Sequence, residues 1–98
     1  MRMPRGAWKE GQIAVHIEEH NLLLVKILGG DVFEGLIGYR VEILRVLYIN
    51  PLFITPEEGQ IFSLLYHPEN PAYCGWYLED ISYHMKTYGD EISKFLVN

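Results

Sequence analysis

The sequence predicts an α+β fold: a mainly antiparallel sheet of about four strands over residues 12–49, packed by a short helix and a longer C-terminal helix. Three observations lead to this prediction. Apolar and polar residues alternate over residues 12–18, as in a strand that is buried on one face. A helix-start signal stands at residues 55–58. Apolar residues then recur every three or four positions over residues 78–95, which predicts an amphipathic helix.

The first three predicted strands are expected to pair in chain order. Residues 12–18 and 22–28 form the first hairpin, because residues 19–21 are typical of a turn. Gly29-Gly30-Asp31 is interpreted as the next loop, after which residues 32–39 pair back on the second strand. Residues 41–49 also fit a helical stripe, but their β-branched content favours a fourth strand.

Both helices are predicted from local signals. Thr55 is expected to cap a helix over residues 56–66, with Pro56 in its first turn and Glu58 completing a capping box. Residues 67–71 contain two prolines and predict a loop. Gly89 is expected to bend or interrupt the C-terminal helix. The stripe of that helix consists of Leu78, Ile81, Met85, Tyr88, Ile92 and Phe95.

Length and composition predict one domain over residues 1–98, with residues 1–10 as an arm that frays. The net charge of −5 opposes binding to nucleic acid or to an anionic membrane, and it favours cations or basic partners. The single cysteine, Cys74, cannot form an internal disulfide. No apolar run approaches the roughly 20 residues of a membrane span, so we expect a soluble cytoplasmic protein.

The glycine-rich stretch "LGGDVFEGLIGYR", residues 28–40, does not match a nucleotide-binding loop, because neither G-x-G-x-x-G nor a P-loop lysine is present. It is interpreted as a hairpin with two possible registers. A three-residue loop at residues 29–31 places Lys26 opposite Glu34 as a surface ion pair. A two-residue loop instead places Glu34 on the apolar face of Leu23, Val25 and Ile27.

Residues 25–39, "VKILGGDVFEGLIGY", resemble the first motif of the Sm-like RNA-binding proteins. In that family the same strand, turn and strand precede an Asp and an Asn that contact the base. The matching positions here carry Arg40 and Leu44, and the family's second motif, built around Arg-Gly, is absent from the sequence of residues 50–98. The resemblance covers about a fifth of the chain. It implies a hairpin and makes oligo-uridine binding one alternative function.

Carboxylates supply the other candidate site. Calcium takes roughly six to eight oxygen ligands, mostly from Asp, Glu and backbone carbonyls. The acidic pocket that we predict for it consists of Asp31, Glu34, Glu79 and Asp80. Carboxylates in the first turn of the C-terminal helix would also complement the helix dipole, which is the competing interpretation of Glu79 and Asp80. In size, acidity and α+β character the chain further resembles a family of small uncharacterised methanogen proteins, for which calcium binding is implied.

Signals for catalysis are weak. Cys74 with His67 or His84 could supply a nucleophile and a base, but no third orienting residue stands out, and a buried structural cysteine is favoured. His16 and His20 are expected to be solvated, because one is placed on a strand and the other in a turn. The aromatic residues around Cys74 are interpreted as core and rim.

The sequence therefore predicts a non-catalytic protein that binds a divalent cation, most simply calcium, weakly through the acidic pocket. Two alternatives stay open. One is a protein-interaction or assembly module that binds a protein partner, or itself, through an exposed apolar strand edge or helix face. The other is an Sm-like RNA-binding protein.

Overall fold

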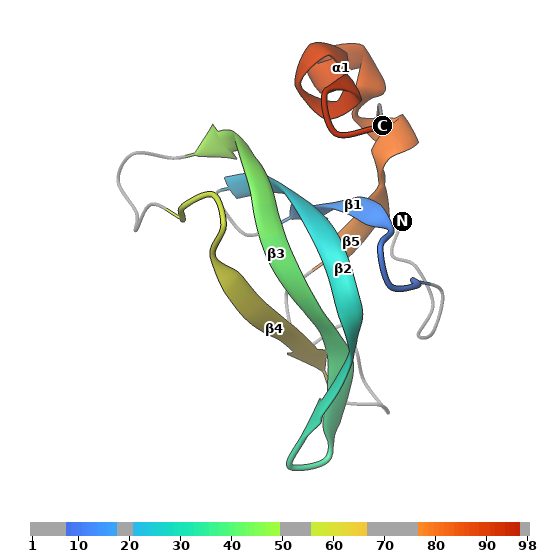
Figure 1. Cartoon of the computed structure of the whole chain (residues 1–98), viewed down its shortest axis with the longest axis vertical. Coiled ribbons are helices and arrows are strands. Elements are labelled where there is room, and N and C mark those ends of the chain that lie inside the picture. Colours follow the sequence, from blue (N-terminus) through green and yellow to red (C-terminus); the bar gives the residue numbers. More distant parts are fainter. Residues whose placement is uncertain (1–7, 18–20, 50–55, 67–76, 97–98) are drawn as a thin grey trace.

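The structure is a computed structural model, and it describes residues 8–17, 21–49, 56–66 and 77–96. Five strands in this part of the chain form one antiparallel sheet in the order β4-β3-β2-β1-β5. The strands are β1 (Ile13–Ile17), β2 (Asn21–Phe33), β3 (Leu36–Ile49), β4 (Ile61–Tyr66) and β5 (Tyr77–Asp80). A 3₁₀ turn, η2 (Ile81–Tyr83), leads into the helix α1 (Met85–Ser93) (Figure 1). The mainly antiparallel sheet and the α+β class are confirmed.

The first four strands pair with their neighbours in sequence, and β5 returns to the free side of β1. The long strands β2 and β3 twist strongly around each other, as adjacent strands do. Their turn lies at one end of the molecule, and α1 lies at the other (Figure 1). The predicted strand over residues 41–49 is confirmed as the second half of β3.

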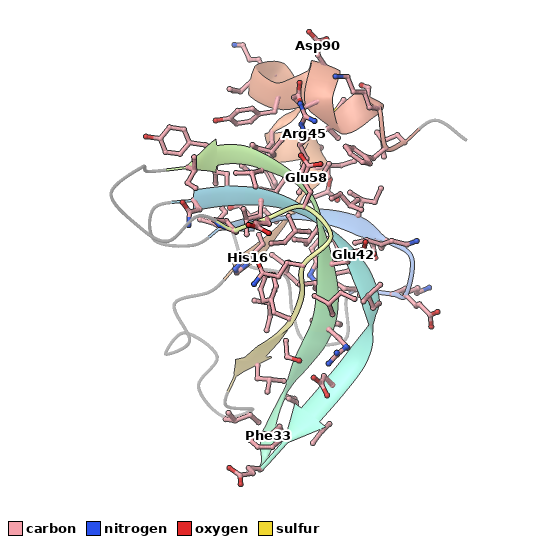
Figure 2. The ribbon with its side chains drawn as sticks, turned by 60° about the vertical axis from the view of Figure 1, so that its left-hand side comes forward. His16, Phe33, Glu42, Arg45, Glu58 and Asp90 are labelled. Carbon is pink, nitrogen blue, oxygen red and sulfur yellow. The ribbon has the colours of Figure 1, made fainter. Side chains whose placement is uncertain are left out.

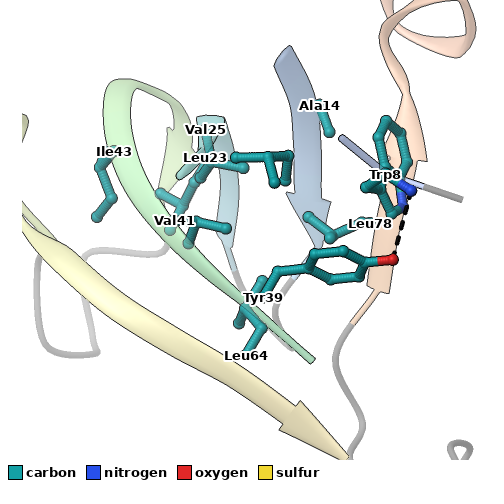
Figure 3. Close-up of a cluster of buried hydrophobic side chains, with 10 residues drawn as sticks. Trp8, Ala14, Leu23, Val25, Tyr39, Val41, Ile43, Leu64 and Leu78 are labelled. Carbon is teal, nitrogen blue, oxygen red and sulfur yellow. Dashed lines mark hydrogen bonds between the residues drawn. The ribbon is translucent and has the colours of Figure 1, made fainter. Parts of the chain in front are cut away.

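Two apolar clusters lie on opposite faces of the sheet. The inner cluster lies between β4 on one side and β1 and β5 on the other (Figure 3). Its buried members are Trp8, Ala14, Leu23, Val25, Ile27, Tyr39, Val41, Ile43, Leu64 and Leu78. The second cluster is built around Val15, Leu24 and Ile92, and α1 supplies one side of it. Every described strand therefore contributes to a core on at least one face.

The segment before β1 is held against the sheet. Trp8 belongs to the inner cluster, and its backbone N–H donates to the phenolic oxygen of Tyr39 at 3.3 Å (Figure 3). The backbone N–H of Lys9 donates to Gln12 Oε1. Trp8 and Lys9 are thus bonded to the folded part of the chain, and residues 1–7 of the predicted arm lie outside the described residues.

The helix predicted over residues 56–66 is wrong, because this segment forms a turn followed by β4. The N–H of Gln60 donates to the carbonyl of Glu57, and Gly59 has a φ of 87°, a left-handed conformation that stops helix growth. From Ile61 onward the backbone pairs with β3. The predicted cap Thr55 and the predicted loop 67–71 lie outside the described residues.

The C-terminal segment contains less helix than the stripe predicts. Residues 77–80 form β5, so Leu78 packs in the inner cluster, while Ile81, Met85, Tyr88, Ile92 and Phe95 pack in the second cluster. Tyr88 has non-helical dihedral angles (φ −122°, ψ 22°) next to Gly89, where the sequence predicts an interruption. None of the helices in the described residues is long and apolar enough to cross a membrane.

Candidate interaction surface

The turn between β2 and β3 lies further along the chain than the sequence predicts. Phe33 pairs with Leu36, so the connection is the two-residue turn Glu34–Gly35. Both residues have positive φ, 49° and 83°, as in the type I′ turn that suits a twisted hairpin. Gly29-Gly30-Asp31 lies inside β2, and the irregularity there is a register shift between Ile27 and Gly29.

This register overturns both predicted placements of Glu34. Lys26 lies opposite Glu42, so it does not face Glu34. Glu34 is exposed at the turn, so it does not lie on the apolar face of β2 either. The Glu34-Gly35 dipeptide between two apolar pairs is the signal that could have located the turn, because a glycine in the second position is typical of type I′.

Asp31 fastens the hairpin to the neighbouring strand. It lies in β2 opposite Gly38 of β3, and its Oδ2 accepts a hydrogen bond from the Ser63 hydroxyl of β4. Its Oδ1 accepts from the N–H of Val32 at 2.9 Å. A single carboxylate thus ties β2 to β4 across β3, near the turn of the hairpin.

Beyond Asp31 the hairpin carries exposed apolar side chains. We call residues 32–37 the hairpin tip. Val32 and Phe33 are 69% and 60% exposed, and they pair with Ile37 and Leu36. Because successive side chains on a strand point to opposite faces, the tip is apolar on both faces. Figure 2 shows Phe33 at the end of the molecule farthest from Asp90 of α1.

The remaining predicted ligands, Glu79 and Asp80, lie on β5 and not in the first turn of a helix. As consecutive strand residues they point to opposite faces of the sheet. Glu79 Oε1 lies 2.8 Å from His84 Nε2. Asp80 caps η2 by accepting from the N–H of Ser82 at 2.8 Å. That backbone bond, followed by a bond from the Ser82 side chain, holds the pKa of Asp80 below its ordinary value.

The structure does not bring the four predicted ligands together. Across residues 8–17, 21–49, 56–66 and 77–96 there is no group of three or more His, Cys, Asp or Glu side chains that could hold a metal ion. Asp31, Glu79 and Asp80 each have a partner of their own, and Glu34 is exposed at the turn between β2 and β3. Calcium binding therefore remains a prediction, because the described residues contain no cluster of side chains that could hold the ion.

Protein-family models, curated protein sequences and solved structures give no match to this chain. The geometry of the described residues therefore carries the functional argument.

Histidine and cysteine positions add little to a catalytic interpretation. His16 is fully buried, and its ring centroid lies 5.7 Å from that of Phe62, so the prediction of a solvated His16 is wrong. The reason is that His16 lies on the same face of β1 as Ala14, toward the inner cluster. His20, His67 and Cys74 lie outside the described residues.

Proposed function

We propose that the chain is a non-catalytic protein-interaction module that inserts its hairpin tip into an apolar pocket of a partner protein. The observation that carries this proposal is the exposure of Val32 and Phe33 at the tip of the longest hairpin. Two neighbouring large apolar side chains with most of their surface in water gain free energy when a partner covers them.

The two-sided character of the tip favours a pocket over a flat partner surface. Val32 and Phe33 are consecutive strand residues that point to opposite faces of the sheet, so a flat surface would cover only one of them. A pocket or groove that encloses the hairpin tip covers both. Large aromatic side chains in such pockets are the residues that most often dominate binding energy.

The negative charge of the chain indicates which residues would surround the partner's pocket. Glu34 is exposed at the turn between the two apolar pairs, and the chain carries a net charge of −5. A partner with Lys or Arg around its apolar pocket would pair with Glu34 and would be attracted to the chain as a whole. The same charge opposes an RNA backbone, which makes the Sm-like alternative the weaker one.

The hairpin tip is also ordered before it binds. A two-residue turn connects the strands, and Asp31 and Ser63 fix the base of the hairpin to β4. A recognition element that is ordered before binding loses less conformational entropy when it binds. The exposed apolar pair is therefore presented on a stiff support.

Site-specific photo-cross-linking tests this proposal. Benzoylphenylalanine replaces Phe33 in one protein and Tyr48 in a control, because Tyr48 is also exposed, to 55%, but lies at the far end of β3. In an extract of the source cells we expect a discrete protein adduct from position 33 that is absent from position 48. Excess wild-type chain and the Tyr48→Asp variant should compete the adduct away, whereas the Phe33→Asp variant should not.

Four results would contradict the proposal. Adducts of the same pattern from both positions, or equal competition by Phe33→Asp, would show that the tip has no special role. An adduct that nuclease removes would point to RNA. A homodimer adduct in the purified protein would replace the basic partner with a second copy of the chain.

A further inference from the structure

The outer part of β2 has a neighbouring strand on one side only. Where β1 begins, the N–H of Ile27 donates to the carbonyl of Gln12, and its carbonyl accepts from the N–H of Gly11. In the part of the chain that the structure describes, no strand pairs with residues 29–33 on the side away from β3. Figure 1 shows the hairpin continuing past β1 toward its turn. We call this side of residues 29–33 the open edge.

The turn determines which backbone groups point out from the open edge. A hydrogen-bonded pair closes a two-residue turn, and here that pair is Phe33 with Leu36. Bonded and non-bonded pairs alternate along an antiparallel ladder, so Asp31 belongs to a bonded pair, whereas Gly30 and Val32 belong to non-bonded pairs. The N–H and carbonyl groups of Gly30 and Val32 therefore point away from β3.

One of these outward groups already has a partner within the chain. The N–H of Val32 donates to Oδ1 of Asp31 at 2.9 Å. Among residues 29–33 this leaves the Gly30 N–H as the outward donor, with the carbonyls of Gly30 and Val32 as acceptors. Gly30 is exposed, and a Cβ atom there would have no neighbour closer than 3.9 Å. A second backbone can therefore approach the open edge at Gly30.

The charge around the open edge favours one kind of partner. Residues 28–37 contain two carboxylates, Asp31 and Glu34, and no basic residue. A second copy of this chain that paired antiparallel through the same edge would bring these acidic residues together, which is destabilising. An extended segment with Lys or Arg beside apolar residues would be attracted to the carboxylates and would cover the exposed Val32. The open edge therefore suits a basic, partly apolar strand of another protein.

We propose that the open edge binds an extended basic segment of the partner protein as an additional strand, through backbone hydrogen bonds to Gly30 and Val32. Strand addition is a recurring mode of peptide recognition, in which main-chain bonds supply affinity and alternate side chains supply specificity. The inference rests on the proposed function, because the same partner encloses the hairpin tip. It adds that the backbone of β2 takes part in recognition together with the apolar side chains of the tip.

Two substitutions at Gly30 separate the backbone from the side chains. Gly30→Pro removes the outward N–H, and proline is tolerated where the N–H of an edge strand faces solvent. Gly30→Ala is the matched control, because it keeps the N–H and has room for its Cβ atom. Circular dichroism verifies that each variant is folded.

The probe is the peptide Lys-Val-Lys-Val-Lys-Val with acetylated and amidated ends, titrated into the ¹⁵N-labelled chain. We expect saturable amide shifts at residues 29–33 in the wild type and in Gly30→Ala. Binding to Gly30→Pro should be about tenfold weaker, because the bond from the Gly30 N–H is lost. The peptide Glu-Val-Glu-Val-Glu-Val is the control for charge, and it should not bind.

Hydrogen exchange in the wild type tests the same bond without a substitution. Saturating basic peptide should slow exchange of the Gly30 amide several-fold. Three results would overturn strand addition: no saturable shift with the basic peptide, unchanged exchange at Gly30, or equal binding by folded Gly30→Pro and Gly30→Ala.

Cross-linking distinguishes this inference from the proposed function. In the cell extract, benzoylphenylalanine at position 33 should form its adduct in the Gly30→Ala background and several-fold less of it in the Gly30→Pro background. An equal adduct in both backgrounds would overturn strand addition by the partner and leave the tip proposal standing. With no adduct in any background the tip proposal fails, and peptide binding at Gly30 alone then supports the open edge as a strand-binding site.

Discussion

A Cβ atom on Gly38 would lie 1.8 Å from the carbonyl oxygen of Leu64 and 2.8 Å from its carbonyl carbon. The strands β3 and β4 therefore approach as closely as they do because residue 38 has no side chain. The atoms in the way belong to the backbone of β4, which cannot rotate aside as a side chain could. This approach lies beside the Asp31–Ser63 bond that fastens the base of the hairpin.

Replacing Gly38 with alanine should separate β4 from the sheet. We expect Gly38→Ala to lower the free energy of unfolding by about 3 kcal/mol, the upper end for overpacking, as measured by urea denaturation. Gly30→Ala is the matched control, because a Cβ there has no neighbour closer than 3.9 Å. It should change the stability by less than about 0.5 kcal/mol. Equal effects of the two substitutions would show that the backbone of β4 does not lie against Gly38.

The turn at Glu34 offers a stabilising substitution. Glu34 is a non-glycine residue with a φ of 49°, which asparagine adopts with less strain. We expect Glu34→Asn to raise the free energy of unfolding by about 0.5 kcal/mol, measured by thermal and urea denaturation. Gly35→Ala should lower it by about 1 kcal/mol, since Gly35 has a φ of 83°. A destabilising Glu34→Asn would argue against a type I′ turn at these residues.

The sheet could be predicted from the sequence because its signals are long. Alternation over residues 12–18 and the apolar, β-branched segments up to residue 49 extend over whole strands, and tertiary packing reinforces them. The helix signal at residues 55–58 is short, and strand pairing outweighs it. The ladder between β3 and Ile61–Tyr66 supplies more hydrogen bonds than one capping box, so the segment is extended.

The four predicted ligands do not gather in the described residues as the sequence interpretation assumed. That interpretation placed Glu79 and Asp80 at the start of a helix and took their convergence with Asp31 and Glu34 for granted. On β5 the same two residues point to opposite faces. The exposed tip was missed because the turn was placed at residues 29–31, ahead of the observed turn at Glu34–Gly35, and Val32 and Phe33 were then counted as ordinary strand residues.

Calcium titration followed by amide NMR separates the two functional hypotheses. We expect millimolar calcium to give no saturable shift shared by the amides near Asp31, Glu34, Glu79 and Asp80. The reason is that Asp31 and Asp80 already accept hydrogen bonds, while Glu79 and Asp80 point apart. Magnesium at the same ionic strength is the control for screening. Saturable shifts at two or more of these positions with calcium alone would restore the acidic pocket.

The cap that Asp80 places on η2 predicts a dependence of stability on pH. Hydrogen bonds from the backbone N–H of Ser82 and then from its side chain hold the pKa of Asp80 below its ordinary value of 3.8. A carboxyl whose pKa is lowered by folding stabilises the folded state at pH values above its unfolded pKa. That contribution is lost as the pH falls through the folded pKa.

The Asp80→Ala variant measures this contribution. At neutral pH we expect it to lower the free energy of unfolding by about 1 kcal/mol, the usual effect of removing a cap. The difference between wild type and variant should persist down to the ordinary pKa of Asp80 and shrink below it, as followed by urea denaturation at a series of acidic pH values. Asp90→Ala, which removes an exposed carboxylate from α1, controls for the change in net charge. A difference that grows as the pH falls would contradict the bond between Asp80 and Ser82.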